Sequence, residues 1–112
     1  MDTIFYLKDR TLVARLSGEI DHHVCDKIRK DIDEEMKLYG AEHLIFDFSG
    51  VSFMDSSGIG MVLGRYKRIH EAGGTVKIRN ASRLVLQLLD MSGIFTLMEY
   101  EETEETEETD GE

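Results

Sequence analysis

The chain has 112 residues, 41% of them hydrophobic, and this length and composition suit one folded domain with one hydrophobic core. Its net charge of −10 is unevenly distributed. Residues 99–112 carry nine acids and no base, whereas the rest of the chain holds 14 acids against 13 Lys and Arg. Neither part offers the basic stripe that neutralises nucleic-acid phosphates, so we expect no nucleic-acid binding.

Targeting signals are not evident in the sequence. No apolar run approaches the roughly 20 residues that span a bilayer, and the N-terminus lacks the basic start and apolar core of a signal peptide. One cysteine, Cys25, excludes an internal disulfide and is compatible with a reducing compartment. We therefore expect a cytoplasmic protein with no membrane association.

Three strands are predicted in the first half of the chain. Residues 3–8 and 12–17 read as short strands joined by a tight turn, and Gly18 is expected to break the second one. Residues 43–48 are mostly apolar, which is typical of a central strand.

A helix is predicted between the second and third strands. Asp21 is a good N-cap for a helix that runs to about Tyr39, and Gly40 is expected to stop it. The apolar residues recur every four positions and predict one buried face, with Cys25 beside it as a core residue: Val24, Ile28, Ile32 and Met36.

A second helix is predicted to begin near Ser57 and to end at Gly73-Gly74. Its buried face would comprise Ile59, Val62, Leu63, Tyr66 and Ile69. Its basic residues would lie off that face: Arg65, Lys67 and Arg68.

The remaining elements are a strand, a helix and a last strand. Residues 75–79 form the predicted strand, and Ser82 can cap a third helix. The inward residues of that helix would be Leu84, Val85, Leu88 and Leu89. Residues 95–98 are expected to form the last strand.

The resulting order, β-β-α-β-α-β-α-β, predicts an α/β fold with a mixed sheet, parallel pairs and an initial hairpin. We assign residues 1–98 to a single domain and residues 99–112 to an acidic tail. Apart from Tyr100, nothing in the tail is suited to burial, so we expect most of it to be disordered and to act as a solubilising segment.

The chemistry lies in residues 52–60, Ser-Phe-Met-Asp-Ser-Ser-Gly-Ile-Gly, at the predicted start of the second helix. A hydroxyl here lies beside unpaired backbone N–H groups and the positive end of a helix dipole. Such a place accepts a phosphoryl group without unfolding the helix, because the local field favours an anion by about 0.3–1 kcal/mol. Gly58 and Gly60 lack side chains, which would let another protein approach closely.

From spacing alone, ordinary helix capping by Asp55, Ser56 or Ser57 explains the same stretch. The wider sequence, however, resembles the signature of the STAS-domain anti-sigma factor antagonists. The resemblance covers about residues 3–98 and rests on five stretches: residues 52–60, Gly-Arg-Tyr-Lys at 64–67, Gly-Gly at 73–74, Gly-Glu-Ile-Asp-His-His at 18–23, and Leu-Asp-Met-Ser-Gly-Ile-Phe at 89–95. The paired histidines and Gly-Arg-Tyr-Lys resemble the sporulation branch most, the anti-sigma F factor antagonists.

The resemblance implies a STAS-type fold and a binding switch that is not an enzyme. In this family the unphosphorylated antagonist binds an anti-sigma factor and releases the sigma factor, which then directs transcription. The anti-sigma factor, bound to ATP or ADP, is also a serine kinase. It phosphorylates the first serine of Asp-Ser-Ser-Gly, here Ser56, and so ends the interaction. A PP2C-type serine phosphatase restores the active form. Since the kinase supplies the nucleotide and magnesium sites, no cofactor is expected in this chain.

The resemblance also implies a partner-binding surface around Ser56, made of Asp21, Asp55, Ser57, Gly58, Ile59, Gly60 and Arg65. Asp21 and Arg65 would lie near Ser56, although helix capping and a solvated charge explain these two equally well. Ile59 is either a core residue or an exposed contact. The chain departs from the family at its C-terminus: relatives continue into a helix, and the Glu-Glu-Thr repeats leave that helix in doubt.

Other functions fit the residues less well. A Ser-His-Asp triad can be assembled on paper, but nothing fixes its geometry. The glycines after Ser57 resemble a dinucleotide fingerprint without its third glycine and its ribose-binding acid. Asp47 lacks the further acids and the lysine of a receiver domain. Adjacent His22 and His23 point about 100° apart on a helix, which disfavours a metal site. The open alternatives are a nucleotide- or small-ligand-binding STAS module and an antagonist of a general-stress sigma system.

Overall fold

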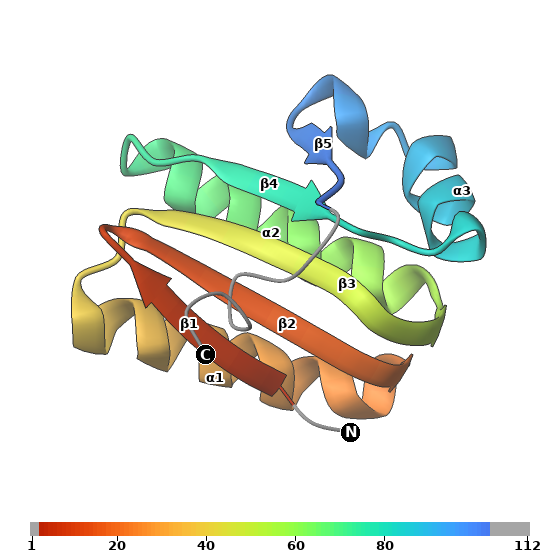
Figure 1. Cartoon of the computed structure of the whole chain (residues 1–112), viewed down its shortest axis with the longest axis horizontal. Helices are drawn as coiled ribbons and strands as arrows, with labels where there is room; N and C mark the ends of the chain where they lie inside the picture. Colours follow the sequence, from red (N-terminus) through yellow and green to blue (C-terminus); the bar gives the residue numbers. More distant parts are fainter. Residues whose placement is uncertain (1–2, 104–112) are drawn as a thin grey trace.

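The computed structural model describes residues 3–103, which form a five-stranded sheet and three α-helices (Figure 1). The elements are β1 (Thr3–Lys8), β2 (Thr11–Ile20), α1 (His22–Tyr39), β3 (His43–Met54), α2 (Ser56–Glu71), β4 (Val76–Arg79), α3 (Arg83–Met91), the 3-10 helix η1 (Ile94–Thr96) and β5 (Glu99–Glu101). This order confirms the predicted α/β fold with β-β-α-β-α-β-α-β connectivity.

The strands lie side by side in their order along the chain, β1-β2-β3-β4-β5. β1 and β2 form an antiparallel hairpin, whereas the pairs from β2 to β5 are parallel. Parallel neighbours need a crossover connection, and α1, α2 and α3 supply these connections. Consequently β2 and β3 end at the same edge of the sheet, and α1 and α2 both begin there (Figure 1).

The hydrophobic core lies between the sheet and its helices. In Figure 1, α1 and α2 run behind the sheet, which shows its other face to the viewer. The inward strand residues alternate, as a strand with one packed face requires. The fully buried side chains of the core include Leu12, Leu16, Leu44, Phe46 and Phe48 from the strands and Ile28, Ile32, Val62 and Leu89 from the helices.

The helix boundaries follow the predicted caps. The Asp21 carboxylate accepts a hydrogen bond from the His23 backbone N–H at 2.9 Å. Gly40 ends α1 in the left-handed conformation, with φ +63°. Ser82 caps α3 by accepting from the Val85 N–H at 3.3 Å. Within residues 3–103, no helix combines the length and the apolar character needed to cross a membrane.

Two strands are longer than predicted. β2 continues through Gly18, which adopts φ +83° beside a register shift, and ends at Ile20. β3 continues to Met54, so the first three residues of stretch 52–60 belong to the strand. The two extensions pair with each other, with Ile20 opposite Met54, and each supplies the backbone partners that the other needs. Glycine in this case marks an irregularity within a strand and not its end.

The C-terminal part differs most from the prediction. Residues 95–98 form the end of η1 and a turn, and the last strand is β5 inside the acidic segment. Residues 99–103 therefore belong to the folded body, and the tail boundary lies later than residue 98. The disorder predicted for the rest of the tail, and the helix left in doubt, lie outside the described residues.

On α3 the prediction of four inward leucine and valine residues is wrong in one case. Val85 and Leu89 are buried and Leu88 is half-buried, but Leu84 is exposed. This short helix packs against the end of β3 and against η1, and only a narrow stripe of it reaches the core.

Candidate functional site

The first turns of α1 and α2 meet at the carboxyl edge of the sheet. The Asp55 N–H donates to the carbonyl oxygen of Ile20 at 3.1 Å, which ties the start of α2 to the end of β2. The Cys25 thiol lies 3.6 Å from the Ser57 hydroxyl oxygen and donates to it. These contacts place the Asp21 cap of α1 and the Asp55 cap of α2 at one edge.

Asp55 caps α2 through its carboxylate. Its Oδ1 accepts from the Ser57 backbone N–H at 2.9 Å and from the Ser57 hydroxyl. These hydrogen bonds hold the pKa of the Asp55 carboxyl below its usual range, with a smaller contribution from the charge of His22. The carboxylate therefore stays ionised at neutral pH and fixes the first turn of the helix.

The two serines of the motif lie in different environments. Ser57 is partly covered, and its hydroxyl donates to Asp55 while accepting from Cys25. Ser56 is the first residue of α2 and is exposed. Among residues 3–103, its hydroxyl has no hydrogen-bond partner. Of the two hydroxyls, only that of Ser56 is open to an incoming reagent.

The two glycines of the predicted surface also differ. A Cβ atom at Gly58 would overlap the Met54 side chain and approach Ile20 to 3.5 Å, so this glycine allows close packing within the chain. Our prediction that Gly58 leaves room for a partner is therefore wrong. Gly60 is exposed, and a Cβ atom there would meet nothing within 4 Å. Ile59 between them is 8% exposed, which places it in the core.

Arg65 does not lie off the buried face as predicted. It follows Ser56 by nine residues on α2, about 13 Å along the helix axis, and is 6% exposed. Its Nε lies 3.1 Å from Oδ1 of Asp33 on α1, and Arg68 pairs with the other carboxylate oxygen at 3.1 Å. Burial lowers the pKa of the Arg65 guanidinium, and Asp33 opposes that effect. Arg65 thus joins α1 to α2, far from Ser56.

The predicted residues therefore separate into two groups. Asp55 and Ser57 are the chain neighbours of the exposed Ser56, Gly60 lies one turn further along α2, and Asp21 caps α1 at the same edge of the sheet. The others, Gly58, Ile59 and Arg65, are buried.

Sequence reasoning missed two exposed residues near this edge. Phe53 is 45% exposed although it is a large aromatic residue next to buried Met54. His22 begins α1 and is exposed, close enough to Asp55 to affect its pKa. Strand alternation could have found Phe53, because an inward Met54 requires its neighbour to face outward.

The structure gives no indication of a metal centre. Within the part of the chain that is described, no group of three or more His, Cys, Asp or Glu side chains is arranged to hold a metal ion. What the site offers is an exposed hydroxyl at a helix N-terminus, where N–H groups and the helix dipole favour an anion.

Comparison with known proteins identifies the family of the chain. The STAS domain family matches residues 4–109. The anti-sigma F factor antagonist of Paenibacillus polymyxa is 45% identical over 87 residues, which cover 78% of this chain and 74% of that protein. The solved structure of the anti-sigma factor antagonist SpoIIAA in its unphosphorylated form is 33% identical, with a TM-score of 0.80 over 96% of this chain and 90% of that one.

A second solved structure shows the Bacillus cell fate determinant SpoIIAA in its phosphorylated form. It is 31% identical, with a TM-score of 0.75 over 96% of this chain and 94% of that one. Sequence and fold agree over most of the length of each relative. The chain therefore belongs to the STAS-domain family, among the anti-sigma factor antagonists.

Proposed function

We propose that this chain is a cytoplasmic anti-sigma factor antagonist that is switched by phosphorylation of Ser56. The unphosphorylated form binds an anti-sigma factor, which is also a serine kinase, and thereby releases a sigma factor for sporulation transcription. Phosphorylation by that kinase ends the binding, and a PP2C-type phosphatase restores it. The observation that supports this role best is the exposed Ser56 hydroxyl, which stands at the start of α2 without a hydrogen-bond partner in residues 3–103.

The choice between the two serines follows from their hydrogen bonds. To attack a phosphoryl group, the Ser57 hydroxyl would have to give up its hydrogen bond to the Asp55 carboxylate. Ser56 has no such bond to break, and its position leaves the helix intact after modification. We therefore assign the phosphorylation to Ser56, while Ser57 donates to Asp55, the cap of α2.

The proposed partner surface consists of exposed and partly exposed groups at the sheet edge that carries Ser56. Asp21, Asp55 and Gly60 are its members from the sequence prediction, and Phe53 and His22 extend it. Aromatic residues, including Phe, are enriched at protein interfaces relative to the rest of the surface. Gly60 adds a place where a partner's backbone can approach α2 closely, since its surroundings are open.

The off-switch is a local electrostatic and steric block. A phosphoryl group adds about −1.5 to −2 charges in the middle of this surface. Against a partner carboxylate about 6 Å away, Coulomb's law gives roughly 1–5 kcal/mol at effective dielectrics of 80 to 20. Since about 1.4 kcal/mol is a tenfold change in affinity, this repulsion is enough to dissociate a micromolar complex. The similarity of this chain to SpoIIAA in both forms supports a switch that leaves the fold unchanged.

The test is phosphorylation by an anti-sigma F factor kinase with ATP and Mg²⁺, followed by intact-mass measurement and peptide mapping. We expect one phosphoryl group on Ser56, none on Ser56→Ala, and one on the matched control Ser57→Ala. Binding of the kinase should be lost after modification, by at least tenfold in Kd.

Three other outcomes would change the proposal. Phosphorylation of Ser56→Ala, or loss of modification only in Ser57→Ala, would move the acceptor to Ser57. Modification by an anti-sigma B factor kinase and not by the F-type kinase would reassign the chain to a general-stress system. No binding to either kinase would reject the antagonist role and favour a small-ligand-binding module.

A further inference from the structure

A cavity of about 480 Å³ lies between the second halves of α1 and α2, and its lining residues fall within 33–42 and 65–72. Both helices begin at the carboxyl edge of the sheet, where Ser56 lies, and run back to the other edge (Figure 1). This α1–α2 cavity is therefore remote from the proposed phosphorylation site. Its volume falls within the range of about 300–1,000 Å³ that is usual for small-molecule sites.

One part of the cavity wall is apolar. It consists of Met36 on α1, Ala41 after that helix, and Ile69 and Ala72 at the end of α2. Ile69 is buried, and Met36 and Ala41 are half-buried. Pockets for small molecules combine a wall of this kind with a few polar groups that fix the orientation of the ligand.

The polar part of the wall contains two arginines that share one carboxylate. Arg65 Nε lies 3.1 Å from Oδ1 of Asp33, and Arg68 Nη1 lies 3.1 Å from Oδ2 of the same side chain. Burial lowers the pKa of the Arg65 guanidinium and Asp33 raises it, whereas Arg68 and Arg29 lower it further. Two positive charges of the wall therefore face a single negative charge.

The other charged residues of the wall balance one another. Lys37 and Glu34 have opposite charges and lie on the same helix, and Glu42 forms an ion pair with Arg10. The wall thus keeps an excess of one positive charge, which lies at the two arginines.

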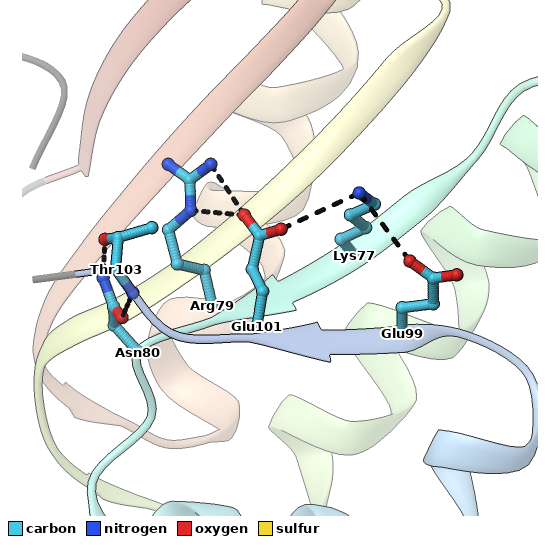
Figure 2. Close-up of polar contacts among 6 residues, drawn as sticks. All are labelled: Lys77, Arg79, Asn80, Glu99, Glu101 and Thr103. Atoms are coloured by element: carbon cyan, nitrogen blue, oxygen red, sulfur yellow. Dashed lines mark hydrogen bonds and ion pairs between the residues drawn. The ribbon is translucent and has the colours of Figure 1, made fainter.

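A second buried arginine shows how this chain satisfies a guanidinium elsewhere. Arg79 is 5% exposed, and both its Nε and its Nη2 lie 2.8 Å from Oε2 of Glu101, which also pairs with Lys77 (Figure 2). Arg65 is 6% exposed, yet its Nε and Nη1 are fully buried without a hydrogen bond to any residue of 3–103. Buried N–H groups that lack an acceptor are rare because they lose their hydration and gain nothing in return.

Nη2 is the nitrogen of Arg65 that a ligand can reach. It is not among the fully buried nitrogens, it has no hydrogen bond within residues 3–103, and its side chain lines the cavity. Arg68 is exposed and lies at the same Asp33 carboxylate, so the two guanidinium groups are close together. Guanidinium groups match the two oxygens of a carboxylate, and an excess of one positive charge favours a singly charged anion.

We propose that the α1–α2 cavity binds a small organic monocarboxylate. Its charged group accepts hydrogen bonds from Arg65 and Arg68, and its apolar body packs on Met36 and Ile69. The ligand supplies an acceptor that the protein does not provide for Arg65, and it compensates the excess charge of the wall. This binding does not depend on Ser56 or on an anti-sigma factor.

The test is a titration of the isotope-labelled full chain with sodium hexanoate, observed by NMR. We expect saturable shifts of the amide signals of Lys37, Ile69 and Ala72, with a Kd of about 1 mM, while the signals of Val13 and Ser56 stay in place. The neutral analogue hexanamide has the same apolar body and should bind about tenfold more weakly, because it lacks the charge that pairs with the arginines.

Variants locate the binding site. Arg65→Met should raise the Kd for hexanoate about tenfold and Arg68→Gln about threefold, since the second guanidinium is exposed and better screened. Lys67→Gln is the matched control, because it removes a cation next to Arg68 that does not line the cavity, and its Kd should equal that of the parent chain. If Arg65→Met does not fold, Arg68→Gln decides, because its exposed side chain is not part of the core.

Four results would overturn the proposal. Shifts that grow with concentration without saturation would show no site, and equal affinities for hexanoate and hexanamide would show that the arginines do not bind the ligand. An unchanged Kd in Arg68→Gln and in any folded Arg65→Met would place the ligand elsewhere. Tighter binding of hexyl phosphate than of hexanoate would reject a monocarboxylate as the class of ligand.

Discussion

Polar residues are exposed or partly exposed in the first turn of α2, whereas a polar residue in the middle of the same helix is buried. In the first turn, Ser56 is exposed and Asp55 holds the helix cap with a partly exposed carboxylate. In the middle, Arg65 is buried against α1 and paired with Asp33. One helix thus presents an exposed hydroxyl at one end and a structural ion pair about 13 Å away.

Residues that belong to one sequence motif can therefore have different roles at different places in the structure. Gly-Arg-Tyr-Lys helped to identify the family, yet its arginine joins two helices and is remote from Ser56, the proposed phosphorylation site. The presence of a residue in a family motif indicates common descent. Whether that residue can contact a partner depends on its burial.

The largest expected effect is on stability at Arg65. Arg65→Ala removes the buried partner of Asp33 but leaves Asp33 paired with Arg68. Breaking a fully buried ion pair costs about 3–5 kcal/mol, and because Asp33 is partly exposed and keeps Arg68 we expect a loss of about 2–3 kcal/mol. Urea unfolding measures this loss. Arg65→Met fills the same space without a charge and should cost less than Arg65→Ala. If Arg65→Ala were as stable as the parent chain but bound the anti-sigma factor poorly, Arg65 would belong to the partner surface.

The two glycines of the first turns should respond differently to alanine. Gly60→Ala adds a side chain in open space and removes glycine from a helix, so it should stabilise the chain by about 0.5–1 kcal/mol. Gly58→Ala forces the buried Met54 side chain to move, and we expect it to be less stable than Gly60→Ala by about 1–2 kcal/mol.

Affinity for the anti-sigma factor should also differ between Gly60→Ala and Gly58→Ala. Gly60→Ala should weaken binding to the anti-sigma factor despite its higher stability, because the new methyl group stands on the partner surface. Titration calorimetry of both variants measures this. Unchanged affinity for Gly60→Ala would remove Gly60 from the proposed surface.

The smallest expected effect is on the pH dependence of stability at Asp55. Because the pKa of this carboxyl is lower in the folded chain than in the unfolded chain, the folded state binds fewer protons between the two values. The contribution of Asp55 is therefore present above about pH 4, the ordinary value, and is lost as the pH falls through the lower folded value. Asp55→Asn can still cap the helix but does not titrate, so its stability should fall less between pH 5 and pH 2 than that of the parent chain. Equal acid profiles in urea unfolding would contradict this role.

Local sequence determined the elements whose signals are short-range. Asp21, Gly40 and Ser82 mark helix ends because a side-chain oxygen, or a residue with positive φ, satisfies groups of the adjacent turn. Periodicity determined the buried stripe of α1 and the inward residues Val85 and Leu89. The serine motif also stood out from the sequence, because its residue types and order match those of a family.

Only the tertiary structure decided the features that depend on a neighbour distant in the chain. Ile20 and Met54 extend their strands because they pair with each other, and β5 forms from acids because β4 presents Lys77 and Arg79 to them. Leu84 is exposed although its spacing fits an inward stripe. Arg65 is buried because Asp33 of another helix lies 3.1 Å from it. In each case the deciding free energy comes from a long-range contact, which the local pattern does not contain.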